Sequence, residues 1–364
     1  MVVNRVFIMA GEPSGDQLGA EFLGSLISAF PKTTVTYTGG PKMKEMLQGQ
    51  VPEVSMERMA FMGFLEVVRH LPVILENDRR IKAHLNRTHP ELVLLVDYPG
   101  YSLRLASWLN KRKSKNWPIR VIQLVSPQFW AWRPGRLDLM GRVLDAVYPL
   151  LPFETKLLNM AGIDAPYYGH PAAWRIKPSQ SNPNGPIALL PGSRKQELAK
   201  HALVFYRAAQ LVGKKMVWFR PNHVSTREYI QLLSSYGVDV LEEQVREGVS
   251  SMSDVSVALV ASGTATLEVA LREIPLVVAY KTSFVTYHIA KRLITVPYIS
   301  LVNLILERNA VAECIQAQCE PRFLAQELQK AQKNTHWKHT FEELRNQLDR
   351  GNPMPKLVAH AMRE

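Results

Sequence analysis

Cysteine is nearly absent from this chain of 364 residues, which contains only Cys314 and Cys319. Two cysteines cannot form the disulfide framework of a small secreted protein, and no nearby Cys or His pair completes a zinc-binding set. The sequence also has no run of about twenty apolar residues, the length that a membrane-spanning helix needs. Its first residues lack the apolar region and cleavage site of a signal peptide and instead predict a strand. These absences favour a cytoplasmic protein that binds no metal.

Acidic residues are scarce relative to basic ones. The 32 Asp and Glu residues against 44 Lys and Arg residues give a formal net charge of +12. This charge favours an acidic partner, for which nucleic acid, a phosphate-bearing substrate and an anionic membrane surface all qualify. The basic residues are not gathered in one tail, and no segment resembles a nucleic-acid-binding module. Nucleic acid is therefore the least expected of the three partners.

Length and patterning predict two domains. The chain is too long for one ordinary core, and 46% of its residues are hydrophobic. Short, continuously apolar runs alternate with segments of helical length, which is typical of parallel strands buried on both faces. The predicted strands are Val2–Met9, Val93–Val96, Val121–Val125, Ala146–Leu150, Ile187–Leu190, Met216–Phe219, Val255–Val260 and Leu276–Ala279, and helices between them include Gln17–Phe30, Gln196–Val212 and Thr264–Glu273.

The predicted fold class is α/β, with two doubly wound Rossmann-like domains that face a cleft. The boundary is expected in residues 175–186, which are rich in Pro, Asn and Ser and have no apolar periodicity. We assign residues 1–174 to the first domain and 175–340 to the second. The helical segment 341–364 is expected to pack back on the first domain or onto a partner subunit. Because ligands bind at the carboxyl ends of strands in such sheets, motifs at strand ends matter most.

The segment Val255–Leu271 carries the strongest of these signals. An apolar strand turns through Ser262, Gly263 and Thr264 into an amphipathic helix. Such a turn leaves backbone N–H groups without partners beside the positive end of the helix dipole, and small residues let an anion approach them. Glu268 follows one helical turn later, where a carboxylate can reach the hydroxyls of a ribose. The segment therefore predicts a site for a nucleotide diphosphate.

A second turn of this kind opens the predicted helix after residue 190. It contains Gly192, Ser193 and Arg194, followed by Lys195. The Arg194 side chain is placed to neutralise a phosphate beside backbone N–H groups. A surface arginine without a ligand is the alternative, but the strand–turn–helix setting favours a functional role.

Two loops of the first domain carry acidic residues at strand ends. The loop GEPSGD contains Glu12, Ser14 and Asp16 and matches neither the dinucleotide fingerprint nor the Walker loop. Ser14 or Asp16 capping the next helix and a role in substrate binding are equally open. Asp97 ends an apolar strand, where partial burial would favour a carboxylate able to accept a proton. A loop aspartate in an Asx-turn ahead of Pro99 is the alternative and the commoner case.

Two aromatic and basic segments complete the first domain. Residues 126–136, SPQFWAWRPGR, could offer Trp132 and Arg133 to an amphiphilic substrate, or they could form an aromatic cluster in the core. Phe61–Leu75, FMGFLEVVRHLPVIL, is followed closely by several Arg and Lys residues. It is either a core helix or a segment that lies in a membrane interface with its cations near lipid phosphates.

Taken together, these segments resemble the family of lipid A disaccharide synthases, which are inverting glycosyltransferases of the two-domain GT-B type. The likeness departs from the family's pattern at Pro13, where Thr or Ala is expected, and after Asp97, where no second acid follows. The resembling segments occur in the family's order from residue 10 to about residue 305: GEPSGDQLGAE, FMGFLEV, VDYPGYSLRLA, SPQFWAWRPGR, LPFE, YGHP, LLPGSR, ASGTATLEVAL and YISLVNLI.

The resemblance implies that UDP-2,3-diacylglucosamine reacts with 2,3-diacylglucosamine 1-phosphate. The products are the β-1,6-linked disaccharide 1-phosphate and UDP, and neither a metal nor another cofactor takes part. It also implies a cytoplasmic enzyme bound peripherally to the inner face of the bacterial inner membrane, and a homodimer is one expected assembly. A UDP-N-acetylglucosamine 2-epimerase or another lipid-linked GlcNAc transferase would share the fold and the nucleotide site, and remains the alternative.

The resemblance and the strand-end positions together suggest roles for individual residues. In the second domain, Arg194 and the turn at Ser262–Thr264 would stabilise the departing diphosphate, and Glu268 would bind the ribose. Asp97 would be the base that takes the proton from the acceptor hydroxyl, with Glu12 as the rival base. The remaining expected contacts with UDP are Gly192, Ser193, Ala265 and Thr266, and those with the acceptor or neighbouring groups are Ser14, Asp16, Trp132, Arg133 and Asn303.

Overall fold

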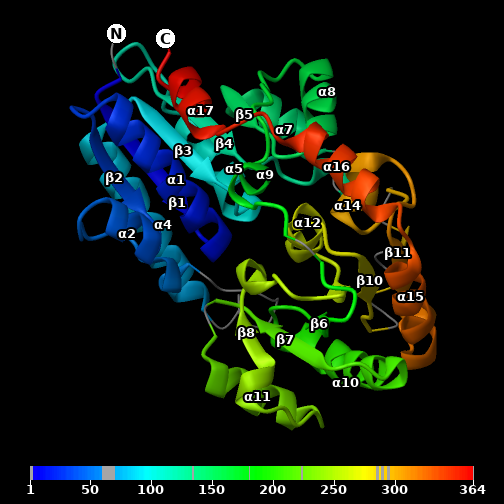
Figure 1. The fold of residues 1–364 in the computed structure, drawn as a ribbon. Helices are drawn as coiled ribbons and strands as arrows, with labels where there is room; N and C mark the ends of the chain where they lie inside the picture. Colours follow the sequence, from blue (N-terminus) through cyan, green and yellow to red (C-terminus); the bar gives the residue numbers. More distant parts are fainter. Residues whose placement is uncertain are drawn as a thin grey trace. The chain divides into compact units, whose positions relative to one another are not determined.

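The structure, a computed structural model, contains two α/β units (Figure 1). It describes residues 3–59, 70–132, 135–179, 181–222, 224–283, 287, 291–292 and 296–363. The first unit consists of Met1–Pro171 together with Arg350–Glu364, and the second of Ala172–Asp349. The chain thus leaves the first unit once and returns to it with its last helix.

The first unit is built on a five-stranded parallel sheet with the strand order β2-β1-β3-β4-β5. All five positions of its central strand are buried, which explains why that segment reads as continuously apolar rather than alternating. Neighbouring strands run in parallel register, so their carboxyl ends meet at one edge. The strands are β1 (Arg5–Ala10), β2 (Thr34–Thr38), β3 (Leu92–Val96), β4 (Arg120–Leu124) and β5 (Ala146–Tyr148).

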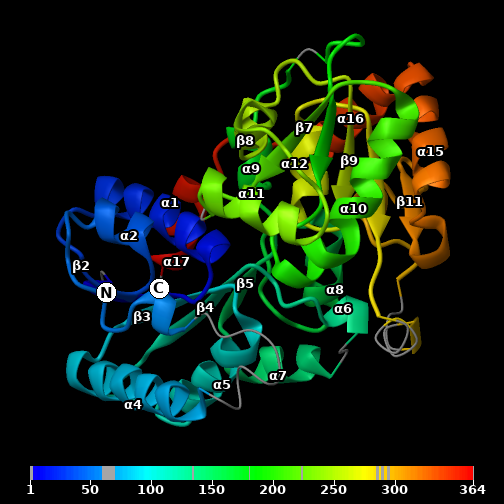
Figure 2. The same ribbon diagram turned by 90° about the horizontal axis from the view of Figure 1, so that it is seen from below.

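Helices cover both faces of this sheet (Figure 2). Val6 and Ile8 of β1 pack in one core with Phe22, whereas Phe7 and Met9 belong to a second core on the opposite face. The helices α1 (Pro13–Ala29), α2 (Pro41–Met46) and α17 (Met354–Ala361) cover the first face, and α4 (Leu71–Thr88), α5 (Pro99–Asn110), α7 (Arg136–Val143) and α8 (Pro152–Met160) contribute to the second. The short α6 (Phe129–Trp132) and the 3₁₀ turn η1 (Met56–Arg58) lie in loops.

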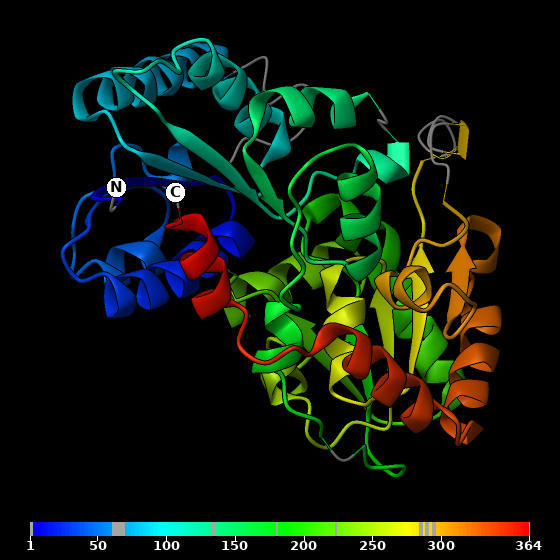
Figure 3. The ribbon, with the colours of Figure 1, turned by 90° about the horizontal axis from the view of Figure 1, so that it is seen from above.

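The last helix is held in the first unit by a defined set of contacts. One guanidinium nitrogen of Arg120 donates to the carbonyl oxygens of His360, Ala361 and Arg363, at 2.9, 3.2 and 2.7 Å. These carbonyls lie at the end of α17, where backbone acceptors lack helical partners, so the cation caps the helix. Figure 3 shows α17 against α1, with which it is in contact.

The second unit is built on a six-stranded parallel sheet with the order β11-β10-β9-β6-β7-β8. One face is covered by α10 (Lys195–Val212), α11 (Thr226–Ser235) and α15 (Pro321–Lys333). The helices α12 (Thr264–Leu271), α14 (Leu301–Leu306) and α16 (Trp337–Leu348) contact one another. The strands are β6 (Ile187–Leu190), β7 (Met216–Arg220), β8 (Val245–Glu247), β9 (Val257–Ala261), β10 (Leu276–Tyr280) and β11 (Ala312–Ile315), and the remaining elements are α9 (Pro171–Arg175), η2 (Glu242–Gln244), η3 (Val249–Ser251) and η4 (Gln316–Gln318).

Within the described ranges, no helix combines the length and the apolar character needed to cross a membrane.

Candidate functional site

The backbone is strained where β3 and β4 of the first unit end. Asp97 and Tyr98 have φ angles of 52° and 53°, and Val125 has a φ angle of 70°. These angles lie in the left-handed region of backbone conformation, which costs a residue with a side chain of order 1 kcal/mol or more. Partly buried hydrogen bonds stabilise this geometry. The amide nitrogen of Gln123 donates to the carbonyl oxygens of Asp97 and Val125, at 3.1 and 3.2 Å, and the Ser102 hydroxyl donates to that of Asp97 at 2.7 Å. Strain held by the surrounding structure is common at functional sites.

The Asp97 side chain is suited to accept a proton. Burial raises the pKa of its carboxyl above the ordinary value, and a hydrogen bond with the Tyr98 backbone partly opposes this. A carboxylate of raised pKa binds a proton more readily than an exposed one. These properties are those expected of a general base.

The predicted rival base, Glu12, lies close to the same turn. Gly11 packs against the Tyr98 ring so tightly that a Cβ atom at residue 11 would lie 2.7 Å from a ring carbon. The negative charge of Glu12 adds to burial in raising the pKa of the Tyr98 hydroxyl, which donates to the carbonyl oxygen of Met59 at 2.9 Å. The ends of β1 and β3 are thus packed together: Tyr98 directly follows Asp97 in the sequence, and its ring packs against Gly11, the residue before Glu12.

The two other polar residues of the GEPSGD loop have different surroundings. Ser14 is exposed in the first turn of α1 and makes no capping hydrogen bond. Asp16 is buried, and its carboxylate accepts hydrogen bonds from the backbone N–H groups of Gly40, Lys42 and Met43, at 2.8, 2.9 and 3.3 Å. Asp16 therefore caps α2 rather than the helix on which it lies, and its carboxylate is occupied by the fold.

The aromatic loop after β4 is tied to α8 by a buried glutamate. The indole N–H of Trp130 donates to Glu154 at 2.8 Å, and Phe153 packs edge-on against the Trp130 ring. Burial raises the pKa of the Glu154 carboxyl to about 7 despite these hydrogen bonds. This pairing shows that part of the loop belongs to the aromatic core. Arg133 and residues 60–69, which include most of Phe61–Leu75, lie outside the described residues, as does the side chain of Trp132.

In the second unit, the turn after β6 binds a carboxylate of its own chain. Gly192 has a φ of 115°, and a Cβ atom there would clash with Glu197. The Glu197 carboxylate accepts hydrogen bonds from the backbone N–H groups of Ser193 and Arg194, at 3.0 and 3.3 Å. The Arg194 guanidinium lies 3.5 Å from the same carboxylate and is mostly exposed. Glu197 thus occupies the N–H groups of Ser193 and Arg194 that were expected to face a phosphate, and the mostly exposed Arg194 guanidinium is the part of this turn that a ligand can reach.

The turn after β9 leaves its donors open. In the part of the chain that the structure describes, the backbone N–H groups of Gly263, Thr264 and Ala265 have no acceptor, and Gly263 and Thr264 are exposed. The Ser262 hydroxyl donates to the carbonyl oxygen of Ile299 at 2.8 Å. Thr266 is fully buried and its hydroxyl donates to the carbonyl oxygen of Gly263 at 2.7 Å, so it shapes the turn rather than facing a ligand. Open donors at a helix N-terminus are suited to bind a phosphate group.

Glu268 lies one turn further along α12. Burial raises the pKa of its carboxyl, and the positive charges of Arg175 and Arg272 partly oppose this. Its carboxylate is thus partly shielded from water, on the helix whose N-terminus carries the open donors. A hydrogen bond from a sugar hydroxyl would offset part of its desolvation.

The structure places Asn303 in a supporting position. Its side chain is fully buried, receives the backbone N–H groups of Ala310 and Val311, and donates to Glu313 at 2.8 Å. Glu313 in turn accepts from the backbone N–H of Ile299, the residue that binds the Ser262 hydroxyl. Asn303 therefore supports the turn after β9 indirectly, through Glu313 and Ile299. Its side-chain amide is fully used in hydrogen bonds within the protein.

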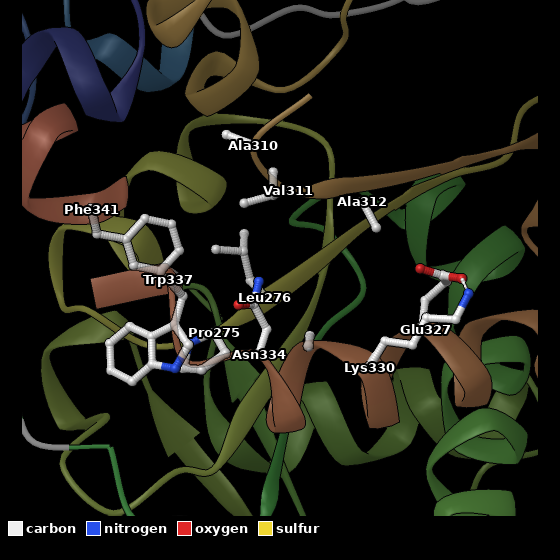
Figure 4. A pocket seen from close by; sticks show the side chains of 11 residues that line it. Pro275, Leu276, Ala310, Val311, Ala312, Glu327, Lys330, Asn334, Trp337 and Phe341 are labelled. Carbon is white, nitrogen blue, oxygen red and sulfur yellow. Dashed lines mark hydrogen bonds and ion pairs between the residues drawn. The ribbon is translucent and has the colours of Figure 1, made fainter. Parts of the chain in front are cut away.

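A cavity of about 240 Å³ lies elsewhere in the second unit (Figure 4). Pro275 and Leu276 at the start of β10, Ala312 at the start of β11, and Trp337 and Phe341 of α16 line it. It is therefore at the amino ends of these strands, whereas ligands of such sheets bind at the carboxyl ends. The described residues contain no cluster of three or more His, Cys, Asp or Glu that could hold a metal ion.

Comparison with known proteins decides the family. A family model described as lipid-A-disaccharide synthetase matches residues 6–353. The chain belongs to this family. A lipid-A-disaccharide synthase of Coxiella burnetii is 32% identical over 374 residues, with 95% of each chain covered.

The lipid-A-disaccharide synthase family accounts for the fold and the reaction class. The chain is a glycosyltransferase of lipid A biosynthesis, and the predicted pair of Rossmann-like domains of the GT-B type is confirmed. A solved structure of the glycosyltransferase of kitacinnamycin has a TM-score of 0.62 at 13% identity, with 99% of this chain and 100% of that chain covered. A UDP-GlcNAc 2-epimerase of Methanocaldococcus jannaschii has a TM-score of 0.60 at 12% identity, covering 98% and 99%. Likeness to epimerases thus extends to the fold alone.

Several residues of the synthase that organise these turns escaped the sequence reasoning. Gln123 and Glu154 of the first unit, and His201 and Glu313 of the second, are polar residues that bind strand-end loops. Each lies inside a segment that reads as a helix or strand, and their partners are mostly distant in sequence. The only sign of these residues in the sequence was a polar side chain where the pattern calls for an apolar one. Such a sign does not show which loop the side chain binds.

Proposed function

We propose that the chain transfers a 2,3-diacylglucosaminyl group from UDP to the 6-hydroxyl of 2,3-diacylglucosamine 1-phosphate with inversion. The observation that supports this proposal is Asp97, whose backbone is strained and whose partly buried carboxyl has a pKa raised by burial. Asp97 takes the proton of the 6-hydroxyl as that oxygen attacks the anomeric carbon. The bond from this carbon to the diphosphate breaks, and UDP leaves with the bonding electrons.

The second unit stabilises the departing UDP in this mechanism. Charge develops on the diphosphate as the bond breaks, and preorganised donors and cations are the groups that lower the energy of such a state. The open N–H groups of Thr264 and Ala265, the dipole of α12 and the exposed Arg194 guanidinium supply them. Glu268 binds the ribose.

The direct test of the function is incubation of the purified protein with both acylated sugars. We expect release of UDP and formation of the disaccharide 1-phosphate, identified by mass spectrometry. Turnover of UDP-N-acetylglucosamine alone is not expected. Absence of product over a range of acyl lengths would contradict the proposal.

Changing Glu268 to alanine is expected to weaken UDP binding by about tenfold, because one charge-assisted hydrogen bond to the ribose is lost. Isothermal titration with UDP measures this, and the KM of the acceptor should change little. Glu242→Ala, at an exposed glutamate of η2, is the matched control. Equal loss of affinity in both variants, or a larger effect on the acceptor, would contradict the assignment.

An anionic membrane surface is the partner that supplies and receives the acylated sugars in this proposal. The start of α4 supports it, because Leu71 and Leu75 are 49% and 52% exposed and Arg79 and Arg80 follow on the same exposed part of the helix. Apolar side chains beside cations suit the boundary between lipid tails and phosphates. The inner face of the inner membrane and the homodimer stay predictions from the sequence.

Replacing both Leu71 and Leu75 by serine is expected to lower binding to vesicles that contain an anionic phospholipid by about tenfold or more, because both apolar side chains lose their burial in lipid. Co-sedimentation at low and high salt measures the binding. Leu211→Ser, at an equally exposed leucine of α10, is the control. Unchanged binding of the double variant would exclude this end of α4 as the contact.

A further inference from the structure

His201, a residue of α10, joins two strand-end loops of the second unit. Its Nδ1 atom lies 2.9 Å from the carbonyl oxygen of Pro191, in the turn after β6. The backbone N–H of Lys281, directly after β10, donates to its Nε2 atom at 2.9 Å. The ring is fully buried, stacks on Phe205 and contacts Tyr280. Both ring nitrogens are therefore used, each by a different loop.

The partners determine the protonation state of this ring. A carbonyl oxygen can only accept and a backbone N–H can only donate, so Nδ1 carries the hydrogen and Nε2 carries the lone pair. The imidazole is neutral, and protonation of Nε2 would set two N–H groups against each other. Burial keeps the pKa of His201 below its ordinary value; the Pro191 hydrogen bond and the Glu197 charge raise it, and the Lys281 charge lowers it.

The strand order of the sheet shows where the two loops joined by His201 lie. Strand β9 lies between β10 and β6, so the loops joined by His201 flank the turn at Ser262–Thr264 on both sides. One of these loops continues directly from Pro191 into Gly192, Ser193 and Arg194. The bridge thus fixes the spacing across the three strand ends that carry the open N–H groups and the Arg194 cation.

We propose that His201 is a positioning residue for the nucleotide diphosphate, which sets the Arg194 turn and the β10 loop at a fixed separation on either side of the α12 N-terminus. It acts through the backbone and does not touch the ligand. The proposal rests on the assignment of UDP to the second unit. The neutral His201 ring accepts the hydrogen bond from Lys281. Protonation of the ring at acid pH therefore releases the β10 loop and weakens UDP binding.

The test compares three variants of the full-length protein. Asparagine and glutamine each carry an amide donor and acceptor. In His201→Asn the shorter amide reaches the Nδ1 position and can donate to Pro191, but falls short of Lys281. In His201→Gln the amide extends to the Nε2 position and can accept from Lys281, but leaves Pro191 without its donor. Phe205→Leu removes a buried ring from the same helix and the same core without changing a hydrogen bond, so it reports on loosening of the core. Binding of UDP by isothermal titration and thermal unfolding are measured for each, and for the wild type from pH 5 to pH 8.

We expect UDP to bind at least one His201 variant about tenfold more weakly than Phe205→Leu, which should bind nearly as the wild type does. The affinity of the wild type for UDP should fall more steeply toward pH 5 than that of the His201 variants. Because UDP itself titrates equally in every measurement, the comparison between proteins removes its contribution. Equal affinity of the His201 and Phe205 variants, or parallel pH profiles, would overturn the positioning role. Absence of UDP binding by the wild type would instead overturn the proposed function.

Discussion

Replacing Asp97 by asparagine is expected to lower kcat by roughly a hundredfold to ten-thousandfold, the usual contribution of a general base. Asparagine cannot take the proton of the acceptor hydroxyl, so the attacking oxygen loses its activation. The variant should fold, because asparagine tolerates the left-handed backbone that Asp97 adopts, with φ of 52°. Affinity for UDP should be unchanged.

The pH profile separates this role from a structural one. Wild-type kcat should fall toward acid pH as the Asp97 carboxyl, whose pKa is raised by burial, takes up a proton and can no longer act as a base. The acid limb should be missing from the residual activity of Asp97→Asn. Glu12→Gln is the matched comparison on the neighbouring strand end. Near-normal turnover by Asp97→Asn, with a larger loss in Glu12→Gln, would transfer the role of base to Glu12.

Replacing Arg194 by alanine is expected to lower kcat by roughly a hundredfold to a thousandfold, as removal of one preorganised group facing a developing charge commonly does. The guanidinium is mostly exposed and its contact with Glu197 is long, at 3.5 Å. Its loss should therefore cost little stability, because exposed pairs of this kind contribute about 0–1 kcal/mol.

Two further variants make the test of Arg194 specific. Arg194→Lys retains the charge without the planar donor array and should recover only part of the activity. Arg207→Ala removes an exposed cation from α10, the helix that Arg194 directly precedes, and should leave kcat unchanged. Steady-state kinetics with both acylated sugars, beside thermal unfolding, measures the effects. A wild-type kcat in Arg194→Ala would exclude the residue from the leaving-group site.

The apolar patterning of the sequence located the central elements of both sheets. Val93–Val96 lies within β3, and Thr264–Glu273 begins at the first residue of α12. Buried parallel strands leave a continuous apolar signal, and a strand that turns into a helix leaves small residues at the turn. The edge strands were harder to recognise: β2 reads TVTYT, and β11 reads AECI with a glutamate inside it.

The roles of polar residues depended on partners that patterning cannot supply. Asp16 accepts hydrogen bonds from the start of α2, 24 to 27 residues later, and His201 accepts one from a backbone N–H that lies 80 residues away. Asn303 stood out as a polar residue in an apolar segment, but its commitment to Glu313 follows from the three-dimensional fold. Helix periodicity indicates which side chains face the interior of the protein. It does not indicate which hydrogen-bond donor or acceptor they meet in the interior.

The return of the chain into the first unit also bears on how the protein folds as it is made. The ribosome releases the strands β1 to β5 early, but α17, which covers the hydrophobic core shared by Phe22 and Met354, is released only after the whole second unit. Domains fold as units during synthesis, so the second unit can finish folding while the first still exposes part of its core. The unit whose strands are translated first is therefore completed after the unit that follows it in the chain.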